Sequence, residues 1–208
     1  VPITRETPTM SPILNIVTPC FRPWHLPRLR DSIVRNLTKI DWRWYVSFDP
    51  RHVHNPPPVP DACVIWQHDH RGGPGRIRDY AMRYVQKGWC YGLDDDNEMH
   101  PDFEPTLLKA IQNNPEALAF VFSQDLGGGG RRLASRDDFE YCKIDMGQYI
   151  WDASLTGDHQ FGKPGNEQKE DWCFFRDAIL PIGPRCVPVP TVATYYNRLT
   201  LPKSNRVH

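Results

Sequence analysis

The sequence lacks several features that assign proteins to common classes. No apolar run approaches the ~18 residues that a membrane-spanning helix needs, and the first residues, 1–6, have no apolar core of a signal peptide. Lys plus Arg and Asp plus Glu are equal at 25 each, so no overall basic charge points to nucleic acid or to an anionic membrane. The phosphate-loop pattern G-x-x-x-x-G-K-[ST] is also absent. We therefore expect a soluble protein with a cytoplasmic location and without an intrinsic membrane span.

The cysteines are scattered and form no C-x-x-C pair. There are six of them, and several lie inside apolar, strand-like runs: Cys20, Cys63, Cys90, Cys142, Cys173 and Cys186. This distribution is typical of reduced thiols in the core of an intracellular protein and does not suit a structural zinc site.

Short apolar runs alternate with amphipathic stretches along most of the chain. Strand-like runs occur at residues 13–17, 44–48, 62–66, 89–93 and 119–122, and helical spacing of apolar residues occurs at 26–37 and 77–85. The alternation predicts an α/β fold with a mostly parallel central sheet flanked by helices. We expect one domain over residues 1–208, which could be a module of a longer protein. The glycine run 127–130, next to Arg131 and Arg132, predicts a mobile loop, with a phosphate cradle as the alternative, and residues 187–196 predict a closing strand.

Three consecutive aspartates, Asp94, Asp95 and Asp96, follow one of the strand-like runs. Carboxylates this close together repel one another unless a cation or a set of donors shares them. An EF-hand loop starting at Asp94 would place Met99 and Pro105 where that loop needs glycine and glutamate, so an EF-hand is excluded. Two interpretations stay open: a solvated acidic turn, or a Mg²⁺ or Mn²⁺ site that also binds a diphosphate.

Other polar residues also stand where predicted strands end. Thr18 follows the first strand-like run and Asp49 follows the second. In open parallel sheets, ligands bind beyond the carboxyl ends of the strands. We therefore expect Thr18, Asp49 and the aspartates to lie in one cleft.

Four segments resemble motifs of a known family, in the family's order. They are Asn-Ile-Val-Thr-Pro at 15–19, Gly-Arg-Ile-Arg-Asp-Tyr-Ala at 75–81, Gly-Leu-Asp-Asp-Asp-Asn at 92–97 and Glu-Asp-Trp at 170–172. The set resembles inverting glycosyltransferases of the GT-A fold, particularly family 2. The resemblance implies a metal-dependent enzyme that moves a sugar from a nucleoside-diphosphate sugar to an acceptor hydroxyl with inversion. It also implies a nucleotide-sugar-binding half at about 12–125 and an acceptor-binding and catalytic-base half at about 126–208.

The resemblance assigns roles on the donor side of the reaction. Six residues are expected to contact the nucleotide sugar: Thr18, Pro19, Asp49, Arg78, Asp94 and Asp95. Asp96 would ligate Mn²⁺ or Mg²⁺, and His159 could complete the metal shell. Asp79 departs from the family's usual asparagine.

On the acceptor side, the resemblance makes Asp171 the general base, with Glu170 as its neighbouring competitor. Asp145 and Gln148 could bind acceptor hydroxyls, and Trp151 and Trp172 could pack against sugar rings. The partners implied are a nucleoside-diphosphate sugar and a carbohydrate or other hydroxyl-bearing acceptor, and no nucleic acid.

Two other functions stay open from the sequence. A sugar nucleotidyltransferase would carry a glycine-rich loop after the first strand, and residues 18–23 contain no glycine. A carbohydrate-binding module without catalytic activity would use the aspartates structurally and would bind sugar without a nucleotide. The donor base, the donor sugar and the acceptor are not specified by the sequence.

Overall fold

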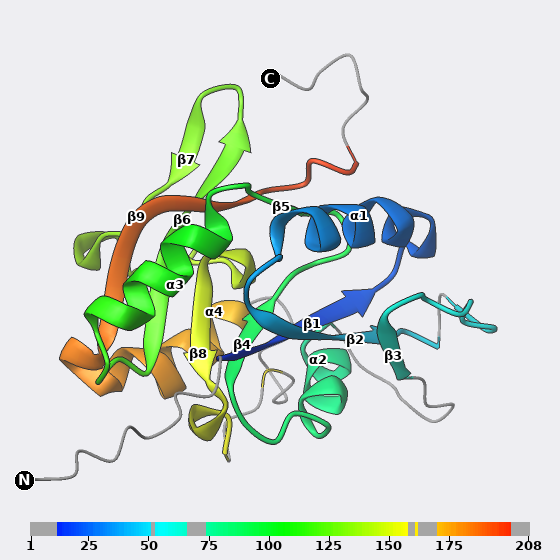
Figure 1. The fold of residues 1–208 in the computed structure, drawn as a ribbon, viewed down its shortest axis with the longest axis horizontal. Helices are drawn as coiled ribbons and strands as arrows, with labels where there is room; N and C mark the ends of the chain where they lie inside the picture. Colours follow the sequence, from blue (N-terminus) through cyan, green and yellow to red (C-terminus); the bar gives the residue numbers. More distant parts are fainter. Residues whose placement is uncertain (1–11, 51–52, 66–73, 158–160, 162–169, 201–208) are drawn as a thin grey trace, which may run out of the picture.

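The structure is a computed structural model that describes residues 12–50, 53–65, 74–157, 161 and 170–200. It contains a single curled sheet with strand order β3-β2-β1-β4-β8-β6-β9-β5, and a further strand, β7, pairs with β6. Helices cover both faces of this sheet (Figure 1). The α/β single-domain fold predicted from the sequence is confirmed.

The first half of the sheet is parallel, as the strand and helix alternation predicts. It comprises β1 (Ile13–Cys20), β2 (Asp41–Phe48), β3 (Ala62–Ile65) and β4 (Trp89–Gly92), and β1 lies between β2 and β4. The helices α1 (Leu26–Asn36) and α2 (Pro74–Met82) follow β1 and β3. Parallel strands are covered on both faces, which is why β1 is an almost continuous apolar run with a buried interior.

The second half of the sheet is mixed. Strand β8 (Tyr149–Asp152) runs antiparallel to both β4 and β6 (Ala119–Gly127), whereas β9 (Cys186–Tyr195) runs parallel to β6. The short β5 (Glu98–Met99) pairs antiparallel with β9. The sheet is thus wholly parallel only from β3 to β4, and β8 joins this half to the mixed half, which corrects the expectation of a mostly parallel sheet.

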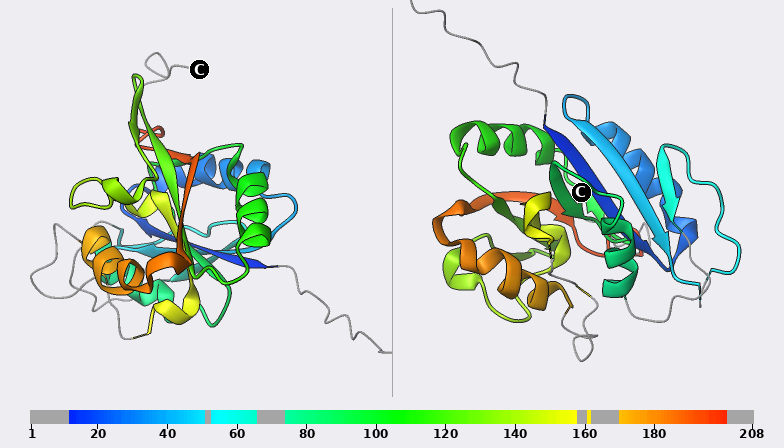
Figure 2. Two further views of the ribbon diagram at one scale, coloured as in Figure 1. Left: turned by 90° about the vertical axis from the view of Figure 1, so that its left-hand side faces the viewer. Right: turned by 90° about the horizontal axis from the view of Figure 1, so that it is seen from below.

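The glycine run predicted as a mobile loop is instead the turn of a hairpin. Strand β7 (Gly130–Arg132) pairs antiparallel with β6, and Gly127, Gly128 and Gly129 all have positive φ angles. Only glycine adopts such angles without steric cost, so the run provides a tight turn between two strands. The hairpin projects from the body of the molecule (Figure 2).

Two hydrophobic cores lie on the two faces of the sheet. One contains Leu29 and Ile33 of α1 and Phe103 and Leu107 of α3 (Phe103–Asn113). The other contains residues of α2 and of α4 (Glu170–Phe174), which continues into a π-helical turn at Phe175–Ile179. In the part of the chain that the structure describes, no helix combines the length and the apolar character needed to cross a membrane.

Candidate functional site

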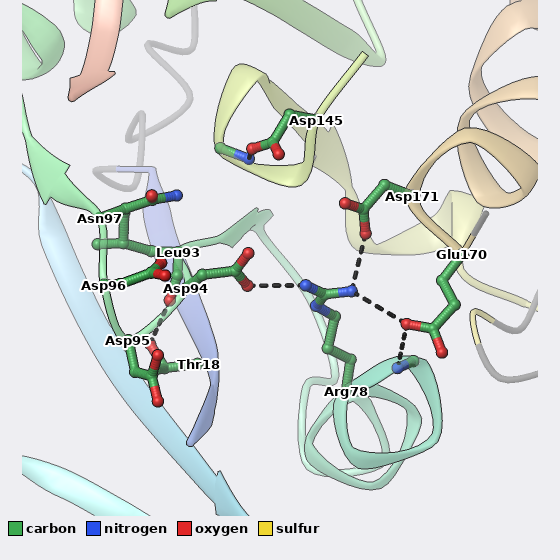
Figure 3. A network of polar contacts seen from close by, with 12 residues as sticks. Thr18, Arg78, Leu93, Asp94, Asp95, Asp96, Asn97, Asp145, Glu170 and Asp171 are labelled. Atoms are coloured by element: carbon green, nitrogen blue, oxygen red, sulfur yellow. Dashed lines mark hydrogen bonds and ion pairs between the residues drawn. The ribbon is translucent and has the colours of Figure 1, made fainter. Parts of the chain in front are cut away.

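The aspartate triplet forms the turn that follows β4. Hydrogen bonds tie this turn to the end of β1, because the Leu93 amide donates to the Val17 carbonyl at 3.0 Å and the Thr18 hydroxyl donates to the Leu93 carbonyl at 2.7 Å. The side chains then diverge: Asp94 points toward Arg78, and Asp95 points away from it (Figure 3). The three carboxylates therefore have different surroundings, although they are adjacent in sequence.

Asp95 is buried and holds the loop after β1 in place. One carboxylate oxygen accepts hydrogen bonds from the Phe21 and Arg22 amides, each at 2.7 Å, and the other accepts from Arg22 Nε at 2.9 Å. Its side chain is 1% exposed. The expected contact between Asp95 and a nucleotide sugar therefore has no support in this geometry, which gives Asp95 a structural role.

Arg78 of α2 joins the triplet to the opposite wall of the cleft. Its Nη2 lies 2.7 Å from Asp94 Oδ1, and its Nη1 lies 2.8 Å from Asp171 Oδ1 and 3.7 Å from Glu170 Oε2 (Figure 3). Burial lowers the pKa of Arg78, but Asp171 and Asp94 outweigh this effect and raise the pKa above its ordinary value. Arg78 therefore stays charged, and three carboxylates share this one cation.

The two acidic residues at the start of α4 differ in what they contact. Glu170 is buried, and its Oε2 accepts a 2.6 Å hydrogen bond from the Gly75 amide in the first turn of α2. The side chain of Asp171 is 25% exposed and lines the cleft. Burial raises the pKa of Glu170 to about 7 and that of Asp171 to about 6, although Arg78 acts in the opposite direction on both. Glu170 thus connects two helices, whereas Asp171 faces the open space.

Asp96 faces the cleft and pairs with Arg22 from the loop after β1. Arg22 Nη2 lies 2.7 Å from Asp96 Oδ2 and also 2.7 Å from Asp95 Oδ1. Burial and the neighbouring charge of Asp94 raise the pKa of Asp96 to about 6. One arginine therefore does not fully offset the burial of the Asp96 carboxylate and the negative charge of Asp94.

The second half of the sheet supplies Asp145, which lies above the cleft in Figure 3. Asp145 Oδ1 accepts hydrogen bonds from Gln124 Nε2 and from the Gly147 amide, each at 3.0 Å, and Oδ2 lies 3.4 Å from Arg132 Nη1. Burial and then the charge of Asp94 raise the pKa of Asp145. The carboxylate is held rigidly at the start of the turn Met146–Gln148.

These side chains enclose a cleft of about 260 Å³. Five of its carboxylates face two arginines, so the cleft is strongly acidic. The described lining residues are Arg22, Pro74, Arg78, Asp94, Asp96, Asp145, Glu170, Asp171, Tyr196 and Asn197. Arg78, Asp94, Asp96, Asp145 and Asp171, which the sequence selected from distant segments, thus meet in one place.

Two residues predicted to contact the acceptor are instead part of the core. The Gln148 side chain is fully buried, where its amide donates to the Phe122 carbonyl at 3.3 Å and its oxygen accepts from the Asp145 amide at 2.9 Å. Trp151 is also fully buried; its indole donates to Thr156 Oγ1 at 3.1 Å, and its ring packs on Phe174. Gln148 ends the turn before β8, which directs its amide toward β6, whereas Trp151 lies within β8 with its ring in the core beside Phe174.

The remaining predicted residues are buried, partly exposed or outside the described structure. The hydroxyl of Thr18 is occupied, because it also accepts from Trp44 Nε1 at 2.9 Å. Pro19 and Asp49 are buried at the ends of β1 and β2. Trp172 is partly exposed and stacks on Phe175, with ring centroids 6.1 Å apart. The remaining candidate, His159, lies outside the described residues.

Sequence reasoning missed Arg22, Gln124 and Arg132. Arg22 follows β1 directly, so its position at a strand end was a usable signal. Gln124 and Arg132 belong to the β6–β7 hairpin, where Arg132 donates to the Gln124 side chain and stacks over the Tyr196 ring at 4.6 Å. Their place beside Asp145 depends on the pairing of distant strands, which no local motif announces.

The oxygen-rich side of this cleft would hold a divalent cation weakly by itself and more tightly when a ligand shares the cation. Within the described ranges, no three His, Cys, Asp or Glu side chains are grouped so that they could hold a metal ion by themselves. Asp94 and Asp96 both line the cleft. Mg²⁺ is commonly held by one or two carboxylates together with phosphate oxygens, so this pair suits a cation that arrives with a diphosphate.

Comparisons with known proteins agree on the fold and the family. The family model described as Glycosyl transferase family 2 matches residues 57–171. Among solved structures, the S. aureus TarS fragment 1–349 has a TM-score of 0.67 at 16% identity, and the match covers 88% of this chain and 59% of that chain. The same fragment in complex with UDP-GlcNAc has a TM-score of 0.67 at 16% identity, over 88% of this chain and 57% of that one.

A longer S. aureus TarS chain has a TM-score of 0.64 at 17% identity, and the match covers 88% of this chain and 36% of that chain. At these identities the likeness shows the fold alone. The chain spans less than two thirds of each of these solved chains. No curated protein matches the sequence.

Proposed function

Because the chain belongs to glycosyl transferase family 2, we propose that it transfers a sugar from a nucleoside-diphosphate sugar to an acceptor hydroxyl, with inversion at the anomeric carbon. The family match confirms the membership predicted from the sequence motifs, and it favours sugar transfer over nucleotidyl transfer or carbohydrate binding without catalysis. Arg22 and Asp145 belong to none of the four motif segments, and they are included in this proposal because they line the cleft.

The observation that carries the proposal is the position of Arg78. It contacts Asp94 on the side of the parallel strands and Asp171 on the side of α4. In open α/β sheets, a ligand occupies the carboxyl ends of the strands, which supports a donor position near Asp94. An acceptor above the donor would then lie against Asp171, so one cleft would hold the two substrates of a transfer reaction.

Asp171 is the proposed general base. Its carboxylate takes the proton of the acceptor hydroxyl while that oxygen attacks the anomeric carbon, and the bond from this carbon to the diphosphate oxygen breaks. The nucleoside diphosphate leaves with the bonding electron pair. A pKa of about 6 keeps Asp171 ionised at neutral pH and still basic enough to accept a proton.

The departing diphosphate needs positive charge, which Arg78 and Arg22 supply from two sides of the cleft. Asp94 and Asp96 would hold Mn²⁺ or Mg²⁺ together with the phosphate oxygens. When bound, such a cation stabilises negative charge without proton transfer. Asp145 and Trp172 remain in the proposal as acceptor contacts, because Asp145 lines the cleft and Trp172 is partly exposed beside Asp171.

UDP-GlcNAc is the first donor to test, because one of the similar solved structures is a complex with it. The experiment screens nucleotide sugars with Mn²⁺, and measures the melting temperature and the release of nucleoside diphosphate. One donor should raise the melting temperature and be hydrolysed slowly, and chelation of the metal should abolish both effects. Pyrophosphate release from a nucleoside triphosphate, or sugar binding that needs no nucleotide, would contradict the proposal.

A further inference from the structure

Arg22 occupies the carboxylate that a cation would need. One guanidinium bridges two neighbouring aspartates, with Nη2 at 2.7 Å from both Asp95 Oδ1 and Asp96 Oδ2. The sharing is possible because Asp95 Oδ1 and Asp96 Oδ2 both face the Arg22 guanidinium at the turn after β4. Asp96, the predicted metal ligand, therefore already carries a positive partner in the protein described here.

The two halves of this bridge differ in how firmly they are held. The backbone amides of Phe21 and Arg22 also donate to Asp95, so this contact survives whatever the side chain of residue 22 does. The guanidinium is tied to Asp95 by Nε at 2.9 Å and by Nη2 at 2.7 Å, but the Arg22 side chain is 34% exposed and lines the cleft. Nη2 can thus turn away from Asp96 while Nε keeps its bond to Asp95 and the backbone stays fixed.

A guanidinium and a divalent cation on one carboxylate repel each other, so a cation that binds Asp96 weakens the contact between Asp96 and Arg22. This step rests on the proposed function, in which Asp96 is a metal ligand. We propose that Arg22 is a positioning residue, whose guanidinium neutralises Asp96 while no cation is bound. When a cation and a nucleotide bind together, the guanidinium moves from Asp96 to the diphosphate of the donor.

The chemistry of the two sites supports this exchange. A planar guanidinium offers several donors in a fixed geometry that matches phosphate oxygens. Arg22 lies on the same cleft wall as Asp96, so the diphosphate that brings the cation also brings a new partner for the arginine. The exchange makes binding of the cation and of the nucleotide mutually favourable, because each ligand removes a cost of binding the other.

The first measurement is Mn²⁺ binding without nucleotide, followed by calorimetry or by the paramagnetic signal of free Mn²⁺. Arg22→Met should bind Mn²⁺ about tenfold more tightly than the natural protein, which corresponds to the loss of one competing charge-assisted contact. With saturating Mn²⁺, UDP should bind the variant about tenfold more weakly, because a phosphate contact is missing. Mn²⁺ affinity that is unchanged, weaker or undetectable in Arg22→Met would overturn the proposal.

Three further variants make the outcome specific. Arg22→Gln repeats the test with a polar side chain should the methionine variant fold poorly, and the same gain in Mn²⁺ affinity is expected. Arg35→Met is the matched control, because Arg35 pairs with Glu98 on the surface at 2.9 Å and should leave Mn²⁺ binding unchanged. Asp96→Asn should abolish the gain in Mn²⁺ affinity when combined with Arg22→Met.

Failure of this inference can be distinguished from failure of the proposed function. If Asp96→Asn weakens Mn²⁺ binding but Arg22→Met leaves it unchanged, the metal site stands and the role of Arg22 is wrong. If Asp96→Asn alone binds Mn²⁺ and UDP as the natural protein does, Asp96 is not a ligand. The metal site of the proposed function is then wrong as well.

Discussion

The two arginines of the cleft face similar partners from different environments. Arg78 lies on α2, is 4% exposed and contacts three carboxylates from two other elements. Arg22 lies on the loop after β1, is 34% exposed and bridges adjacent aspartates of a single turn. Buried ion pairs cost much to open once formed, whereas exposed pairs contribute little. The ion pairs of Arg78 are therefore a fixed part of the site, whereas the ion pair between Arg22 and Asp96 can open.

The largest effect should come from the carboxylate that Arg78 orients. Asp171→Asn should lower kcat for transfer by about 10²–10⁴-fold, the usual contribution of a positioned general base. Donor affinity should change little, because the asparagine keeps its size beside Arg78. Steady-state rates of nucleotide release and calorimetric donor binding would separate the two effects. In the natural protein, the rate should also fall as the pH drops through about 6, because Asp171 then becomes protonated.

The matched control is Asp177→Asn, which removes a carboxylate that pairs with Arg176 on the surface at 2.6 Å. It should leave both the rate and donor binding unchanged. Equal losses of donor affinity and of rate in Asp171→Asn would assign Asp171 to folding or to donor binding. Full activity in that variant would remove it from the mechanism.

Arg78→Met tests the fixed side of the comparison. The free energy of unfolding should fall by ~3–5 kcal/mol, since removal of one partner leaves the other charges buried and uncompensated. Urea denaturation would measure the change. Arg83→Met is the control, because Arg83 is exposed just beyond the same helix, and there we expect a change within ~0.5 kcal/mol. A small loss at Arg78 would mean that its carboxylates become protonated or hydrated at little cost.

The parallel half of the fold was predictable because its signals are local. Each strand from β1 to β4 is a short apolar run, and a helix at 26–36 follows the first of them with correct spacing. The antiparallel strand β8 was not predictable, because its neighbours β4 and β6 are distant in sequence. The direction in which two strands pair depends on the whole chain path.

The candidate site shows the same limit at the level of side chains. The motifs located Asp94, Arg78 and Asp171 on three elements, and the fold brings these three together. They did not tell which way a side chain turns. Asp95 and Trp151 point into the protein because the turn after β4 and the register of β8 place them there. Residue type selects candidates, and backbone geometry decides which of them face the cleft.

A smaller effect is expected on the pH dependence of stability, in which the buried residues Glu170 and Glu104 should act in opposite directions. In the folded protein, Glu170 has a raised pKa of about 7, so its protonated form stabilises the fold at low pH, and this stability is lost as the pH rises through about 7. Glu170→Gln cannot ionise, so it does not lose stability as the pH rises, and its side-chain oxygen still accepts a hydrogen bond from the Gly75 amide. The variant should therefore gain about 1–2 kcal/mol relative to the natural protein between about pH 5 and pH 8. Urea denaturation at both pH values would measure this gain.

Glu104→Gln provides a control of opposite sign. Glu104 accepts hydrogen bonds from the amides of Thr38, Lys39 and Ile40, and although burial raises its pKa, these bonds lower it below the ordinary value. Its stabilising effect is present at neutral pH and is lost as the pH falls through that lowered pKa. Glu104→Gln should thus be less stable than the natural protein at neutral pH, and the difference should shrink in acid. The same pH trend in both variants would contradict the assignment at Glu170.

The smallest effect should come from the movable side of the comparison. Arg22→Met should lower the free energy of unfolding by only ~1 kcal/mol, because the guanidinium that pairs with Asp95 and Asp96 is partly exposed and Asp95 keeps two amide donors. The loop after β1 should keep its place, since the Phe21 amide and the amide of residue 22 still donate to Asp95. Urea denaturation of Arg22→Met beside Arg78→Met would test the contrast directly. Equal losses in the two variants would mean that Arg22 is as fixed as Arg78, and an arginine held that firmly could not give Asp96 up to a cation.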